Sequence, residues 1–299
     1  MNDVSRNVVS VTIVVSLGAT FLFGYNLAVL NQASFLIREF YNETYTRRRG
    51  AGVDGNETMS IEAITALWSF TSAVYIPGGI VGALLAGHLA DRIGRIRTVL
   101  VSLIFTAVGA FCGTVCVIAG SPELLLIGRF VVGIQFGIGA CIAPIVVAEI
   151  STPSIRGLLQ GFGYSAIGTF GLFVSGVLGL PTLLSAGNRW PYLHLVELAP
   201  ALLAVCVLPF VPETPHHIQM RFENSAVTAG SGESDEIRRE LVHSLRFYRR
   251  SSGVACEFTT ISIADREKRP AVQEHVTIIQ LLRNKSLRRP LVIACTLQV

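Results

Sequence analysis

Acidic and basic residues are gathered in a few short segments of this sequence, and their types suit ion pairing. The segment 87–97 reads GHLADRIGRIR and places one acid and three arginines within one short stretch. A second segment carries an acid seven residues before an arginine, and a third carries an acid directly after a proline. Carboxylates and guanidiniums form strong, charge-assisted hydrogen bonds with one another. The residues concerned are Asp91, Arg92, Arg95, Glu149, Arg156 and Glu213.

Patterns that would indicate catalysis or a bound cofactor are missing from the sequence. It contains no Walker loop, zinc motif or nucleophile elbow, and its cysteines and histidines are scattered. Segment 161–166 matches the dinucleotide pattern G-x-G-x-x-A, but it lies inside an apolar run and follows no strand. We therefore expect neither an enzyme nor a cofactor or metal site.

Long runs without charge lie on both sides of the basic segment, at residues 63–90 and 98–122. Each exceeds the roughly 20 residues that a helix needs to cross a bilayer. Apolar residues make up 51% of the chain and charged residues 15%, so the composition indicates a polytopic membrane protein. In lipid the backbone must satisfy its own hydrogen bonds, which favours helices. We predict six spans, near residues 8–30, 62–87, 98–120, 125–148, 157–181 and 190–211.

The distribution of basic residues predicts the orientation of these spans. Lysine and arginine follow the second and fourth spans and are abundant beyond residue 220, which places those segments and the amino terminus in the cytoplasm. The loop 31–61 is then outside, although it carries three consecutive arginines. Asn42 and Asn56 in this loop each begin an N-x-[ST] sequon, so both are predicted glycosylation sites. The net charge of +4 is spread over several loops and gives no support for a nucleic-acid partner.

Hydropathy divides the chain into three regions. Residues 1–215 are predicted to form the six-helix bundle, and residues 216–289 a cytoplasmic amphipathic helical linker. Residues 290–299 are apolar but too short to cross, so we interpret them as the start of a truncated seventh span. The apolar positions at helical spacing in the linker are Ile237, Leu241, Leu245 and Tyr248.

Several segments together resemble the sugar porters of the major facilitator superfamily, among them the facilitative glucose and fructose transporters. Segment 128–157 resembles the family's G-R-F…G…G…P…E-x-x-x-x-x-x-R-G signature, and P-E-T-P at 212–215 resembles its P-E-S-P-R motif. Segment 87–97 resembles the loop between the second and third spans, and FGYNLAVLN resembles part of the first. The resemblance implies an all-α membrane protein, the six-transmembrane-helix amino-terminal half of a major facilitator fold, acting in the plasma membrane.

The resemblance also assigns roles to the charged residues. It implies that Asp91, Arg92, Arg95, Glu149, Arg156 and Glu213 form a conformational latch at the cytoplasmic end, partly with the carboxyl-terminal half of the fold. Ion pairs of this kind can form when a pore is closed on the inside and break when it opens. The alternative is that these charges are static and only set the orientation of the helices.

Substrate contacts should come from polar or aromatic groups on the pore helices, because sugars need hydrogen bonds and stacking surfaces. The candidates are Phe23, Asn26, Tyr164 and Ile167. Family similarity supports the positions of Phe23, Asn26 and Ile167, whereas Tyr164 stands where related transporters carry a sugar-binding glutamine. Leu27 replaces a residue that is commonly small or hydroxylated.

The first span also bears on energy coupling. Related proton-driven symporters carry an aspartate after F-G-Y, and Asn26 cannot titrate, so the sequence favours a uniporter. Glu197 in the sixth span is a charged residue within a predicted membrane helix and is a functional candidate. Because it lies seven residues from the outer end of that span, we expect it to reach the interface. His216 stands where the family has arginine.

Two classes of function remain open at this point. The first is a facilitative hexose transporter represented by its amino-terminal half, which is inactive alone and needs the missing carboxyl-terminal half or a related transporter chain. Proton-coupled sugar symport is a variant of it. The second is a truncated, non-transporting membrane protein that inserts in the bilayer and binds a partner.

Overall fold

The computed structural model describes residues 6–49, 59–180, 182–184, 187–228 and 231–249. These residues form helices joined by short turns, and none of them lies in a strand. Six helical segments are long and apolar enough to cross a membrane, which confirms the six predicted spans. They run over Arg6–Gln32, Ile61–Ile93, Arg95–Ile118, Pro122–Ile150, Arg156–Leu178 and Arg189–Phe210.

Four of the spans are divided into shorter elements. The first consists of α1 (Arg6–Ser16), the π-helical turn η1 (Leu17–Phe21) and α2 (Leu22–Gln32). The second consists of α4 (Ile61–Ala73) and α5 (Tyr75–Ile93). The fifth consists of α8 (Arg156–Gln160), the π-helical η2 (Gly161–Ala166) and α9 (Ile167–Leu178). The sixth consists of η3 (Gly187–Tyr192), α10 (Leu193–Val196), α11 (Leu198–Val207) and η4 (Leu208–Phe210).

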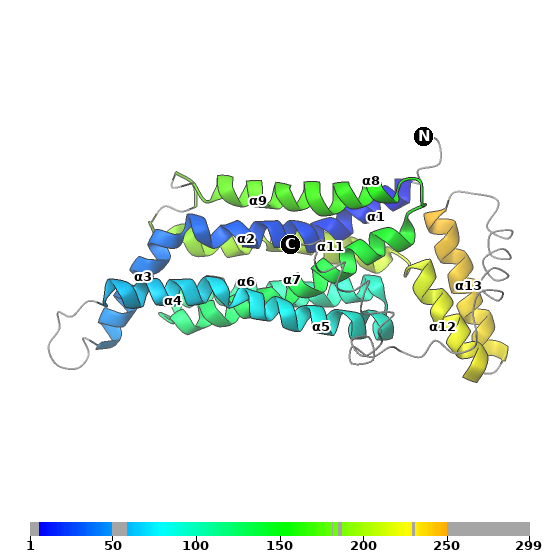
Figure 1. Ribbon diagram of the computed structural model, residues 1–299, viewed down its shortest axis with the longest axis horizontal. Coiled ribbons are helices and arrows are strands. Elements are labelled where there is room, and N and C mark those ends of the chain that lie inside the picture. Colours follow the sequence, from blue (N-terminus) through cyan, green and yellow to red (C-terminus); the bar gives the residue numbers. More distant parts are fainter. Residues whose placement is uncertain (1–5, 50–58, 181, 185–186, 229–230, 250–299) are drawn as a thin grey trace, which may run out of the picture. The chain divides into compact units, whose positions relative to one another are not determined.

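The third and fourth spans are single long helices, and both begin with strong local signals. In α6 (Arg95–Ile118) the start is set by Gly94, whose φ of 103° is a conformation that favours glycine. In α7 (Pro122–Ile150) the first residue is a proline, whose fixed φ suits the first helical turn. The helices α5, α6 and α7 lie together, while α9 lies along α1 and α2 (Figure 1).

Glycines allow the closest of these helix contacts. A Cβ added at Gly78 would lie 2.2 Å from the carbonyl oxygen of Phe130, and one added at Gly133 would lie 2.2 Å from the carbonyl oxygen of Tyr75. The backbones of α5 and α7 therefore approach closely, as the small-residue faces of membrane helices permit. Gly171 performs the same role between α9 and the first span.

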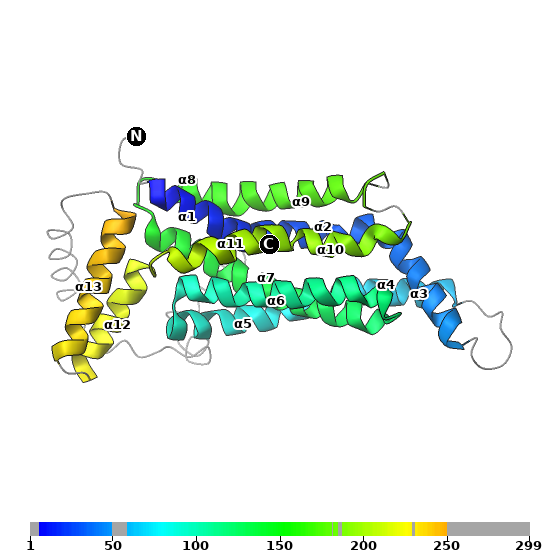
Figure 2. The ribbon, with the colours of Figure 1, turned by 180° about the vertical axis from the view of Figure 1, so that it is seen from behind.

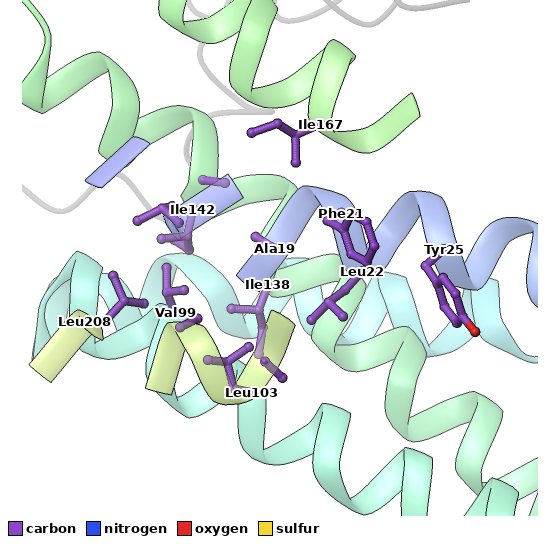
Figure 3. Packing of buried hydrophobic residues seen from close by; sticks show 14 of the residues in the cluster. Ala19, Phe21, Leu22, Tyr25, Val99, Leu103, Ile138, Ile142, Ile167 and Leu208 are labelled. Carbon is purple, nitrogen blue, oxygen red and sulfur yellow. The ribbon is translucent and has the colours of Figure 1, made fainter. Parts of the chain in front are cut away.

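The core lies where the first span meets α6, α7 and α11. Leu22, Val99, Ile138, Ile142 and Leu208 are fully buried there. Figure 3 shows these side chains pointing toward one another from four of the spans. Between membrane helices such a core is stabilised by van der Waals packing, because lipid tails are as apolar as these side chains.

Residues 34–49 form a helix, α3 (Ser34–Arg49), in the segment between the first and second spans. The segment carries polar and basic residues, but an apolar stripe runs along one face of the helix. Ile37, Phe40 and Tyr41 are buried along one face, and the Tyr41 hydroxyl lies 2.7 Å from that of Thr71 in α4. At the far end Arg48 makes a two-pronged ion pair with Glu123, with the shorter contact at 2.6 Å.

Two helices follow the sixth span at the other end of the bundle. They are α12 (Pro215–Thr228) and α13 (Ser231–Tyr248), and they lie across the ends of the spans in Figures 1 and 2. The predicted apolar stripe of α13 is confirmed, since Ile237, Leu241, Leu245 and Tyr248 are all buried. Tyr248 donates a hydrogen bond to Pro212 and Ser244 donates one to Glu213, both at 2.7 Å and both to backbone oxygens.

We call this end of the bundle the α12 end. The turn between α5 and α6 and the turn between α7 and α8 both lie at this end. The predicted linker boundary at residue 216 falls one residue after the start of α12, and the region 290–299 lies outside the described residues.

Candidate functional site

A buried polar network crosses the interior of the bundle, and it consists of Asn26, Tyr75, Arg129 and Glu197. The Asn26 side-chain amide donates to a Glu197 carboxylate oxygen at 2.5 Å and to the backbone oxygen of Leu22 at 3.0 Å. Arg129 donates to the Asn26 side-chain oxygen at 3.2 Å and to its backbone oxygen at 3.3 Å. Asn26 therefore joins an acid and a base that come from two other spans.

The charges of this network are shielded from solvent. Glu197 is fully buried and Arg129 is 5% exposed. The Arg129 guanidinium also lies over the Tyr75 ring, 4.7 Å from its centroid, a cation–π contact that helps to stabilise a desolvated cation. One oxygen of Glu197 has no hydrogen-bond partner and lies 3.9 Å from the imidazole of His194. Burial of a carboxylate with an unpaired oxygen costs free energy of folding, so Glu197 is a candidate functional group.

The interface position expected for Glu197 is therefore wrong. Depth along the span suggested that its side chain would reach water, but the side chain points between the helices toward Asn26 in the first span. Counting residues from the end of a helix gives its depth and does not give the face that a side chain occupies.

A second charged site lies at the α12 end and centres on Arg95, the first residue of α6. Its guanidinium donates to Glu149 of α7 at 3.3 Å and to the backbone oxygen of Ala90 at 3.1 Å, and it lies 3.6 Å from Asp91. Its remaining contact is with the Nδ1 atom of His217 in α12, at 2.8 Å. Arg95 is only 6% exposed, so this site joins four helices, α5, α6, α7 and α12, around one buried cation.

Glu213 serves the same end of the bundle in a different way. Its carboxylate accepts hydrogen bonds from the backbone amides of Ile96 at 2.8 Å and Thr214 at 3.2 Å. A negative charge at the first turn of a helix satisfies free amides and is favoured by the helix dipole. A Cβ on Gly94 would lie 2.4 Å from a Glu213 oxygen, so a glycine is needed at this turn for space as well as for conformation.

Comparison with known proteins decides the family. The model of the family described as "Sugar (and other) transporter" matches residues 11–299. The chain belongs to this family.

Relatives of this chain include facilitated glucose transporters of solute carrier family 2. The chain is 36% identical over 209 residues to human member 9, covering 70% of this chain and 37% of the relative. It is 31% identical over 277 residues to human member 4 and to human member 5, covering in each case 93% of this chain and 51% of the relative. The chain therefore spans about half the length of these relatives, or less.

Solved structures show the same fold. The proton:xylose symporter XylE bound to 6-bromo-6-deoxy-D-glucose matches with a TM-score of 0.67 at 23% identity, over 86% of this chain and 52% of the symporter. A partially occluded inward-open form of the E. coli protein gives the same TM-score and identity, over 88% of this chain and 60% of the other. The six spans thus adopt the arrangement of a major facilitator transporter, as the sequence predicted.

The four predicted substrate residues of this sugar transporter family member occupy different environments. Phe23 is half-buried and stacks on Phe136 of α7, with ring centroids 4.6 Å apart. Tyr164 in η2 is 43% exposed. Asn26 is committed to the buried network, and Ile167 is 8% exposed and packs in the apolar core, as Figure 3 shows.

The predicted latch residues are only partly assembled. Arg95 and Glu149 form an ion pair, and Asp91 lies beside them. Arg156 is exposed, and within the described part of the chain it has no ion pair, so Glu149 is paired with Arg95 instead. Arg92 is exposed as well. Among the described residues of the α12 end, these two arginines are therefore exposed to solvent.

Two functional candidates were missed by sequence reasoning. Arg129 was noted only as a letter of the family signature, and His217 only as one of several scattered histidines. A single arginine within a long apolar run was the available signal for Arg129, because an intramembrane charge needs a partner. Nothing in the local sequence of His217 distinguishes it from His216, which is exposed.

One of the two sequons, at Asn42, lies within the described residues. Asn42 lies on α3, is half-buried, and accepts a hydrogen bond at 3.1 Å from the backbone amide of Met59. Its sequon threonine, Thr44, is 6% exposed. Asn56 lies outside the described residues.

Proposed function

We propose that the chain contributes the amino-terminal half of a hexose transporter that works by alternating access in the plasma membrane. The relatives described above are facilitated glucose transporters, which supports a hexose as the substrate. Transporters of this kind place the substrate near the middle of the membrane between two helical repeats. The described part of the chain supplies six spans, so we propose that a second six-helix unit, on the same polypeptide or on another, completes the transporter.

The observation that carries the proposal is the charged site at the α12 end. Arg95 and Glu149 form a nearly buried ion pair, while Arg92 and Arg156 remain exposed beside it. We infer that the exposed arginines pair with the second unit when the pore is closed at this end. Such pairs add stability to one of two conformations, which is what alternating access requires.

We further propose that the α12 end faces the cytoplasm and that Asn42 and Asn56 face the outside. The support is the excess of lysine and arginine at the α12 end. The exposed Tyr164 and the half-buried Phe23 are the predicted sugar contacts most open in this conformation. Asn26 and Ile167 would contact a sugar only after a movement of the first or fifth span.

The test is hexose uptake by cells that lack their own hexose transporters and express this chain joined to the carboxyl-terminal half of human facilitated glucose transporter member 5. We expect saturable uptake of glucose or fructose, and an Arg156→Ala variant with equal surface density should transport more slowly. An Arg6→Ala variant, changed at an exposed arginine at the start of α1, is the matched control. Normal kinetics for Arg156→Ala at equal density would contradict the latch.

Uniport is the coupling mode that we favour, because Asn26 in the first span cannot exchange a proton. One observation favours the alternative of proton-coupled symport, namely the buried Glu197 that contacts Asn26. The two are separated by measuring uptake with and without an inward proton gradient. Uniport predicts the same hexose uptake in both conditions. Symport predicts that the proton gradient drives hexose accumulation and that Glu197→Gln abolishes this accumulation.

A further inference from the structure

The contact between Arg95 and His217 fixes the protonation of the histidine. Arginine only donates hydrogen bonds, so the Nδ1 atom that lies 2.8 Å from its guanidinium must be the acceptor. The imidazole proton then resides on Nε2, and the ring is neutral. His217 thus accepts a hydrogen bond from Arg95 that a cationic residue could not accept.

The charges around His217 oppose its protonation. It is 3% exposed, and the charged groups that face it are Arg95 and Arg97 of α6, Asp91 of α5 and Arg221 of its own helix. Three of these four are cations. Burial, followed by the Arg95 charge, lowers the pKa of His217 to about 4.

We propose that His217 is a positioning residue for the α12 end, which as a neutral acceptor holds the Arg95 guanidinium against Glu149. Glu149 has one oxygen without a hydrogen-bond partner, so its hold on Arg95 rests on a single contact at 3.3 Å. The imidazole contact is the shorter of the two. It also joins α12 to α6, so the linker helix and the ion pair are linked through one side chain.

A pH dependence follows from this arrangement. Because the pKa of His217 is lower in the folded chain than the ordinary value near 6.5, its contribution to stability is complete above about pH 6.5. The contribution is lost as the pH falls from about 6.5 toward 4, because a protonated ring would repel Arg95. The sequence also supplies the control, since the adjacent His216 is exposed.

The experiment measures the melting temperature of the purified 299-residue chain between pH 7.5 and pH 5. His217→Asn keeps a neutral acceptor near the Nδ1 position and cannot titrate, so it should melt close to the wild type at pH 7.5. It should lose less on acidification than the wild type does. His217→Lys should melt several degrees lower already at pH 7.5, while His216→Asn and His216→Lys should follow the wild type throughout.

Equal acid losses for the wild type and His217→Asn would overturn the proposal. So would a His217→Lys variant that melts like the wild type at pH 7.5. If His217→Asn does not fold, a nuclear magnetic resonance titration of the wild-type chain decides the matter, because the pKa of His217 should lie at least one pH unit below the ordinary value near 6.5. A pKa of His217 at or above 6.5 would refute the inference.

The role of His217 in the ion pair does not depend on the proposed function. These measurements need no substrate, so their failure leaves the uptake test standing, and failure of the uptake test leaves the role of His217 in the ion pair intact.

Discussion

Replacement of Asn26 by leucine tests whether the buried polar network holds the first, fourth and sixth spans together. Leucine has a similar volume and no hydrogen-bonding group. It would leave Glu197 without its 2.5 Å donor and would remove the 3.2 Å side-chain acceptor of Arg129, while both charges stay buried. The helix itself would be unaffected, because leucine is a good helix former.

The size of the effect can be bounded from these two hydrogen bonds. Bonds to charged groups in proteins contribute about 1.5–3 kcal/mol each, which sets an upper limit near 6 kcal/mol. Hydrogen bonds between membrane helices average about 0.6 kcal/mol, which sets a lower limit near 1 kcal/mol. A value of about 3 kcal/mol corresponds to a decrease in melting temperature of roughly 6–12 °C for a chain of this size.

The assay is thermal unfolding of the purified chain in detergent at pH 7.5. Asn31→Leu is the matched control, because Asn31 lies on the same helix and is exposed. Asn26→Leu should melt well below this control. If both variants melt within 2 °C of the wild type, on the order of the smallest effect considered above, the network does not hold the spans together.

Three further outcomes are expected. Gly94→Ala should lower the melting temperature by several degrees because the residue has a φ of 103° and the new Cβ would strike the carboxylate that caps α6, whereas Gly87→Ala, which has open space, should not. Gly133→Ala should destabilise by about 1–3 kcal/mol through overpacking of α5 against α7, and an unchanged melting temperature relative to Gly176→Ala would refute that close contact. Protein made in microsomes should show a smaller glycosidase-sensitive mobility shift when Asn42 is changed to Gln, and digestion of this loop by protease added on the cytosolic side would contradict the proposed orientation.

The sequence predicted the elements whose signals are local. Long apolar runs located all six spans, since a helix that crosses lipid must be long and predominantly apolar. The stripe of Ile237, Leu241 and Leu245 located the buried face of α13 for a similar reason. Both inferences depend only on residues that are near one another in the chain.

What failed or was missed depends on contacts between distant segments. The sequence analysis did not predict the helix α3, because its buried face is short and its other faces are polar. The buried position of Glu197 depends on its rotation toward Asn26, 171 residues away in sequence. The same is true of His217, whose partner Arg95 is 122 residues away and whose neighbour His216 points to solvent.

Hexose counterflow in proteoliposomes tests the central claim most directly. Two proteins are compared, the 299-residue chain alone and a chimera in which this chain replaces the matching part of human facilitated glucose transporter member 5. We predict that the chain alone gives no more uptake than empty vesicles and that the chimera gives saturable counterflow of a hexose. Saturable uptake by the chain alone, or a folded chimera that moves no hexose, would contradict the proposal that this chain is one half of a hexose transporter.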